Sequence, residues 1–131
     1  MFGIFRRLLG FSGQAKEQAD DAFPSSVVGV TFKNRDNSKR QKIIEDFVHR
    51  GMRLVLVADD TNRHDKNAVA VMTDQNQQIG HLNARLAADV RKWWSQNKRV
   101  HATVTEVTGG AGDKEYYGVN IEIEIFLPPK A

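Results

Sequence analysis

The sequence predicts one α+β domain in which about six strands form a curled antiparallel sheet or open barrel, with two helices packed outside. Three observations predict this fold. Six stretches have strand composition or alternate apolar and polar residues with period two. Two further stretches place apolar residues at helical spacing. The helices interrupt a series of strands rather than alternating with them, which argues against a doubly wound parallel sheet.

The first half of the domain is expected to hold a strand, a helix and two more strands. "SSVVGVTF" at 25–32 has strand composition, with Val28, Val30 and Phe32 on one face. A helix near 39–49 would begin at an N-cap, Asn37 or Ser38, and stop at Gly51. Its apolar stripe comprises Ile43, Ile44, Phe47 and Val48. "MRLVLVA" at 52–58 and "AVAVM" at 68–72 are expected to be strands on either side of a polar loop.

The second half is expected to hold a short strand, a helix and a hairpin. "IGHL" at 79–82 is a strand that ends at a helix cap, Asn83. The helix would run to about residue 96, with an apolar stripe formed by Leu82, Leu86, Val90 and Trp93. "KRVHATVTEV" and "YYGVNIEIEIF" alternate with period two, and "TGGAGDKE" between them is expected to be the hairpin loop.

Length and composition predict one core with tails. The 131 residues suit one domain, placed at 24–127 from Pro24 onward, with a flexible segment at 1–23 and a tail at 128–131. "MFGIFRRLLGFS" at 1–12 is basic and amphipathic, which is typical either of a peripheral membrane anchor or of a frayed or docked terminal helix. No apolar run is long enough to span a bilayer, so no integral membrane association is expected.

The chain has no cysteine, which excludes disulfides and zinc sites with Cys ligands and fits a reducing cytoplasm. The formal charge of +3 and the pI near 9.3 permit an anionic partner. Phosphate-binding and nucleophile-elbow motifs are missing, and no cofactor is expected. His64, Asp65 and His81 are weak candidates for metal ligands, and they keep open an alternative in which the protein is a metal-dependent hydrolase acting on nucleic acid.

Cations gather at the two helices, and aromatic residues lie near them. The cations are Lys33, Arg35, Lys39, Arg40 and Lys42 at the first helix and Arg85, Arg91, Lys92, Lys98 and Arg99 along the second. Cations neutralise phosphates and aromatic rings stack on unpaired bases, so the pattern is typical of a nucleic-acid-binding surface. The same residues also suit solvated helix faces and a core, and composition alone leaves these interpretations level.

Three stretches together resemble the HIRAN domain over about 100 residues. They are "VVGVTF" at 27–32, "DDTNRHDKNAVAV" at 59–71 and "QIGHLNARLA" at 78–87. The loop pattern is N-x-x-D-x-N-A-[VI]-x-V, formed here by Asn62, Asp65, Asn67, Ala68, Val69 and Val71, and an I-G-[HY]-[LV] segment follows it. The family occurs in SWI2/SNF2-type DNA translocases and in stand-alone bacterial proteins. The resemblance implies a small OB-like β-barrel with helices outside.

The resemblance also implies binding of single-stranded DNA and of its 3′ end. By this resemblance Asp65 accepts a hydrogen bond from the terminal hydroxyl, Phe32 and His64 stack on bases, and His81 is a polar pocket residue. Thr31 and Ala84 stand where the translocases carry basic residues, and Lys33 stands in place of an aromatic residue. Lys33, Arg40 and Arg85 would then hold the phosphates.

We therefore expect a non-catalytic module that binds single-stranded DNA or its 3′ ends in repair or replication. The alternatives are a protein-interaction module that has lost DNA binding and the metal-dependent hydrolase.

Overall fold

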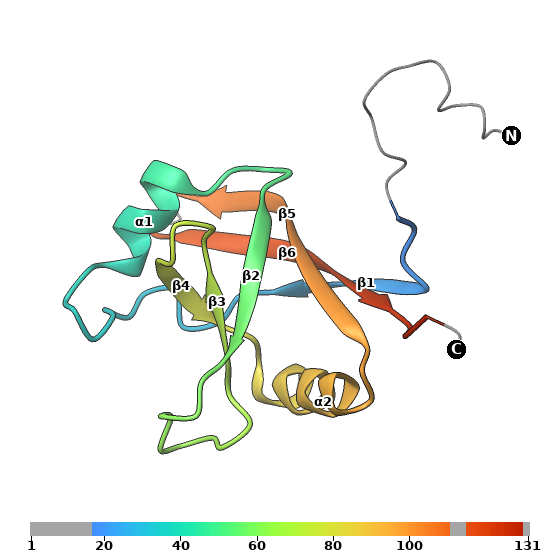
Figure 1. Ribbon diagram of the computed structural model, residues 1–131. Helices are drawn as coiled ribbons and strands as arrows, with labels where there is room; N and C mark the ends of the chain where they lie inside the picture. The colour runs from blue at the N-terminus through green and yellow to red at the C-terminus, as the bar shows by residue number, and fades with distance from the viewer. Residues whose placement is uncertain (1–16, 111–114, 130–131) are drawn as a thin grey trace, which may run out of the picture.

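Six strands, each antiparallel to its neighbours, form one sheet in the computed structural model, which describes residues 17–110 and 115–129 (Figure 1). The sheet order is β1-β6-β5-β2-β3-β4. The strands are β1 (Asp21–Ser26), β2 (Arg53–Ala58), β3 (Val69–Met72), β4 (Gln78–His81), β5 (Arg99–Gly109) and β6 (Tyr117–Phe126). The helices are α1 (Arg40–Phe47) and α2 (Ala84–Ser95). The predicted α+β fold, a curled antiparallel sheet with two helices, is confirmed.

The sheet curls into a half-barrel because the chain beyond β1 bridges its two ends. The backbone N–H of Val27 donates to Val119 in β6, at 3.0 Å. One residue later, Val28 and His81 of β4 exchange two backbone hydrogen bonds of 2.9 Å each. Gly80 makes this approach possible, since a Cβ there would lie 2.4 Å from the Val28 carbonyl oxygen. The closure brings β4 beside the loop that leads to α1.

The core lies inside the curl and follows the predicted alternation. In β5 the buried residues are Val100, Ala102 and Val104, and in β6 they are Val119, Ile121, Ile123, Ile125 and Phe126. α2 packs on β5 and β3 through the predicted stripe, of which Leu86 and Val90 are buried. Its N-cap is Asn83 as predicted, because the Asn83 side chain accepts from the Leu86 N–H at 2.9 Å.

The first strand lies earlier than predicted. β1 ends at Ser26, whereas the sequence pattern placed a strand over 25–32. Gly29 adopts a positive φ of 73°, and the Phe32 N–H donates back to the Gly29 carbonyl, so residues 29–32 form a turn. Phe32 is consequently 66% exposed instead of sharing a buried face with Val30.

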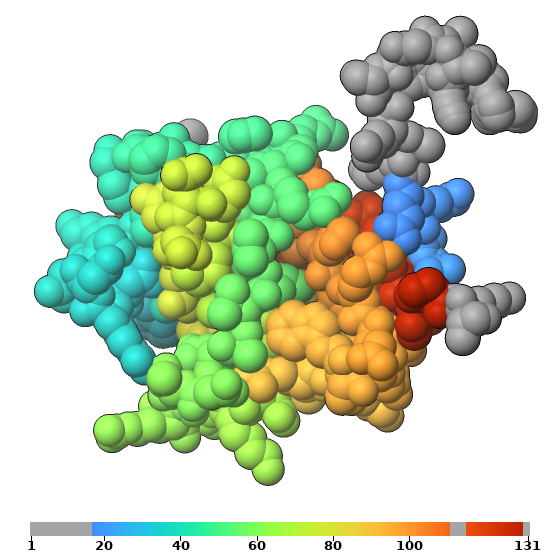
Figure 2. Space-filling model, viewed as in Figure 1, coloured from blue at the N-terminus to red at the C-terminus, as the bar shows by residue number. Residues whose placement is uncertain are grey.

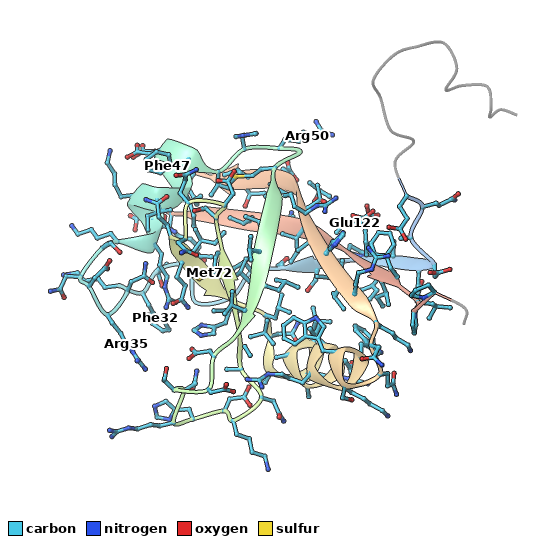
Figure 3. All side chains as sticks on the ribbon, in the orientation of Figure 1. Phe32, Arg35, Phe47, Arg50, Met72 and Glu122 are labelled. Carbon is cyan, nitrogen blue, oxygen red and sulfur yellow. The ribbon has the colours of Figure 1, made fainter. Side chains whose placement is uncertain are left out.

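The start and the last turn of α1 also differ from the prediction. The N-cap is Lys39, without a side-chain cap, rather than Asn37 or Ser38. Asn37 has a positive φ of 71° in the preceding loop, and Ser38 bonds to Asp36 instead. The helix ends at Phe47, four residues before Gly51. Phe47, the last residue of the helix, is 50% exposed (Figure 3).

Several expectations concern the chain ends and the hairpin. Residues 1–16, which include the amphipathic stretch, residues 111–114 of the hairpin loop, and residues 130–131 of the tail lie outside the described part. Neither described helix has the length and apolar character that a membrane crossing requires.

Candidate nucleic-acid interface

The loop between β1 and α1 is built by its own polar side chains. Asn34 is the central residue, because its amide donates to the Gln78 carbonyl of β4 at 2.9 Å and to the Ser38 hydroxyl at 3.1 Å. Backbone hydrogen bonds from Asn34 to Ser38 and from Asn37 to Asn34, both 2.9 Å, close the loop on itself. These contacts attach the loop to β4, and Phe32 projects from the loop with its ring exposed (Figure 3).

Arg40 braces this loop from the first turn of α1. Its Nε donates to Asn34 Oδ1 at 2.7 Å, and its Nη1 donates to the Gly29 carbonyl at 2.9 Å. The residue is only 6% exposed. Burial lowers the pKa of Arg40, and the nearby Asp59 carboxylate acts in the opposite direction. The sequence predicted a phosphate ligand, and the structure shows that most of this guanidinium serves the fold.

The loop between β2 and β3 is held by its own amide and carboxylate. Asn62 Oδ1 accepts from the backbone N–H groups of His64 and Asp65, at 2.8 and 3.0 Å. Asp65 Oδ1 accepts from the Asn67 N–H at 2.8 Å. Asn62 and Asp65 therefore form consecutive Asx turns, so part of the polar character of this loop serves to hold its own backbone. The side chain of His64 is exposed on this loop.

A depression with a volume of about 300 Å³ lies between these two loops; we call it the cationic depression. Figure 2 shows the loops projecting from one side of the molecule, cyan for 31–39 and light green for 59–67. The lining of the cationic depression includes four cations, two histidines and one carboxylate: Lys33, Arg35, Arg40, Arg63, His64, His81 and Asp59. Arg35 connects the loops, because its Nη2 donates to the Thr61 carbonyl at 3.4 Å. The excess of cations suits a phosphate group.

Asp59 and His81 form a half-buried pair on the floor of the cationic depression. Asp59 Oδ2 lies 2.9 Å from His81 Nε2, and the two side chains are 20% and 21% exposed. Hydrogen bonds from His81 and from the Thr61 hydroxyl hold the pKa of Asp59 below its ordinary value. Sequence reasoning did not single out Asp59. The available signal was its place directly after the strand 52–58, four residues before Arg63, the first cation of the loop.

The structure gathers some of the predicted residues and separates others. Lys33, Arg40, His64 and His81 line the cationic depression. Phe32 lies beside it, since Gly29 is flanked by the Arg40 guanidinium and the Phe32 ring. Arg85 is exposed at the start of α2 and lines a different depression, beside β1. Asp65 is adjacent to His64 but is not among the residues that line the cationic depression.

The candidate metal ligands do not come together. Within residues 17–110 and 115–129, no group of three or more His, Cys, Asp or Glu side chains is placed to hold a metal ion. His81 faces Asp59 rather than Asp65.

Comparison with protein families matches residues 22–127 to the HIRAN domain. Two solved structures share the fold. The HIRAN domain of human HLTF is 19% identical with a TM-score of 0.58, covering 79% of this chain and 74% of that one. A protein from Lactobacillus plantarum is 18% identical with a TM-score of 0.53, covering 79% of this chain and 99% of that one. No curated protein matches the sequence.

Proposed function

Because the chain belongs to the HIRAN domain family, we propose that it binds single-stranded DNA at a free 3′ end without catalysing a reaction. HIRAN domains are known as modules that bind DNA 3′ ends. The observation that carries the proposal is the cationic depression, where four Lys and Arg side chains surround one carboxylate. Phosphate neutralisation supplies much of the affinity of such proteins.

The side chains divide into three roles. Lys33 and Arg63 are exposed cations of the lining, so they would hold phosphates, and Arg40 would add a contact from the wall. Phe32 and His64 project from the two loops and would stack on bases. Arg85 lies outside the cationic depression and would contact the strand farther from its end.

Asp65 is the carboxylate best suited to accept from the terminal hydroxyl. Its Oδ1 accepts from the Asn67 N–H, while its Oδ2 has no hydrogen-bond partner among the described residues. Asp59 is less suited, because its Oδ2 faces His81 and its Oδ1 accepts from the Thr61 hydroxyl at 2.7 Å. An ionised carboxylate accepts from a hydroxyl and repels a phosphate, so it would distinguish the two kinds of 3′ end.

Fluorescence anisotropy with three short DNAs tests the proposal: a free 3′-hydroxyl, a 3′-phosphate, and a 3′ end closed within a duplex. We expect the free hydroxyl to bind about tenfold or more tightly than the phosphate, since hydrogen bonds to charged groups contribute roughly 1.5–3 kcal/mol. Affinity should fall steeply with salt. Asp65→Asn should abolish the preference, and Asp60→Asn should retain it as the matched control, because Asp60 is exposed on the same loop and does not line the cationic depression.

Two results would contradict the proposal. Equal affinity for all three ends would leave DNA binding but remove end recognition. No binding at low salt would remove DNA binding itself and would favour the protein-interaction alternative.

A further inference from the structure

A second depression, of about 340 Å³, lies beside the cationic depression and is formed in part by the turn between β3 and β4. Thr73, only 1% exposed, fixes this turn. Its hydroxyl accepts from the backbone N–H groups of Gln75 and Gln77, at 3.3 and 3.2 Å. Asn76 has a positive φ of 64°, which presents its side chain from a tight bend. The wall of this depression is therefore preorganised.

Side-chain amides dominate the polar lining of this second depression, which we call the amide depression. Among the described residues, the side-chain amide of Asn76 makes no hydrogen bond. The NH₂ group of Gln77 likewise has no partner, since only its Oε1 accepts, from the Thr73 hydroxyl. Gln78 uses its NH₂ group on the Gly80 carbonyl, which leaves its Oε1 open. Donors and acceptors are thus both available.

The rest of the lining suits a flat, neutral, partly apolar group. Ile43 and Met72 contribute apolar surface to the lining. The charges balance, with Arg35 as the one cation and Asp36 as the one carboxylate among the lining residues. Hydrogen bonds from the Ser38 hydroxyl and N–H hold the pKa of Asp36 below its ordinary value, so Asp36 is ionised at neutral pH. A phosphate would gain little here, whereas a nucleobase matches the lining.

The cationic and amide depressions adjoin each other, so one DNA strand can run through both. Arg35 and Gln78 line both of them. Asn34 lines the amide depression and bonds to Arg40, which lines the cationic one, at 2.7 Å. A strand whose phosphate lies in the cationic depression would therefore have its neighbouring nucleotide within reach of the amides.

We propose that the amide depression takes the base of a nucleotide next to the one held in the cationic depression, with adenine favoured; this rests on the proposed function. A side-chain amide can donate from its NH₂ group to N7 of adenine and accept at its oxygen from the N6 amino group. Bases of a single strand can be splayed out and read on such edges. The domain would then read sequence as well as strand ends.

The test measures base preference rather than affinity. Anisotropy is measured with 3′-hydroxyl oligonucleotides in which each of the last four positions carries each of the four bases or an abasic residue. We expect one position to favour adenine about fivefold or more, the discrimination of a good amide–base pair. Asn76→Gly keeps the positive φ and removes the amide. Asn76→Gly and Gln77→Ala should reduce the base ratio, which is the affinity for adenine divided by that for the other bases, toward one. They should leave unchanged the salt slope, which is the slope of log affinity against log salt concentration.

Gln75→Ala is the matched control, because Gln75 is exposed on the same turn and does not line the amide depression. Thermal melts establish that all three variants fold. Equal affinity for all bases at every position would overturn the inference and leave the proposed function standing. A preference that survives both amide variants, or one that is lost equally in Gln75→Ala, would also overturn it. No binding of any DNA would overturn the proposed function together with this inference.

Discussion

The cationic and amide depressions share the loop between β1 and α1, yet they differ in charge. The cationic depression is completed by the loop after β2, which adds Arg63 and His64. The amide depression is completed by the turn after β3, which adds Asn76 and Gln77 without any charge. Under the two proposals, one shared loop serves two kinds of ligand group, because the opposing segment determines whether the lining is cationic or made of neutral amides.

The largest expected effect follows from Arg40→Ala, which removes the brace of the shared loop. Asn34 Oδ1 and the Gly29 carbonyl would lose their donors in a region where Arg40 is almost fully buried. An unsatisfied buried acceptor costs about 1–3 kcal/mol, so we expect the free energy of unfolding to fall by roughly 2–4 kcal/mol. Urea denaturation measures this loss. DNA affinity and base preference should both weaken, because both depressions depend on Asn34.

The matched control for Arg40→Ala must leave the backbone contacts of α1 intact. Gln41→Leu would not, because Gln41 bonds to the backbone of Val30 and Tyr117. Lys39→Ala is suitable, because Lys39 is an exposed neighbour that makes no side-chain cap. If Arg40→Ala had the stability and affinity of the parent, Arg40 would be neither a brace nor a phosphate ligand.

Lys33→Ala and Arg63→Ala should weaken phosphate binding in the cationic depression without affecting the amide depression. Each removes an exposed cation that lines only the cationic depression. We expect affinity to fall at low salt and the slope of log K against log salt to decrease by about one per cation. The base ratio should stay unchanged. Titrations at several salt concentrations measure the slope. A changed base ratio with an unchanged slope would reverse the assignment of the two depressions.

Asp59→Asn tests the electrostatics of the cationic depression through pH. The pKa of Asp59 is lowered in the folded state, mainly by the His81 hydrogen bond, so its stabilisation is present above the unfolded pKa of about 4 and is lost as pH falls through the folded pKa. We expect the parent to lose on the order of 1 kcal/mol more stability than Asp59→Asn between pH 5 and pH 3. Urea midpoints at both pH values measure this difference. Parallel losses would show that the Asp59–His81 pair does not stabilise the fold.

Local periodicity predicted the parts of the fold in which burial follows from spacing along the chain. The alternation of β5 and β6 and the stripe of α2 placed Ile121, Ile123 and Val90 in the core correctly. β1 was misplaced because its end depends on the turn at Gly29 and on the bridge between Val28 and His81. These are contacts between distant segments, which periodicity does not encode.

The candidate site was predictable in its residue types and not in their partners. Arg40 has the sequence context of a surface cation, yet the loop folds over it and supplies two acceptors. Asp59 and Asp65 belong to the same polar segment, and the path of the backbone directs only Asp59 into the cationic depression. Nothing in the order of the residues distinguishes two carboxylates six positions apart, because the difference arises from the Asx turns at Asn62 and Asp65.

The smallest expected effect, from Asp36→Asn, bears most directly on the contrast between the two depressions. Asp36 is an exposed carboxylate in the amide depression. If that depression takes a neutral base, removing the charge should tighten binding of every DNA only slightly, by less than about fivefold, through weaker long-range repulsion. The base ratio should not change. A gain confined to one base, or a steeper salt slope of the size expected for a new phosphate contact, would show instead that a phosphate enters the amide depression. The two depressions would then differ only in how strongly they bind phosphate, and the shared loop would guide the DNA backbone through both.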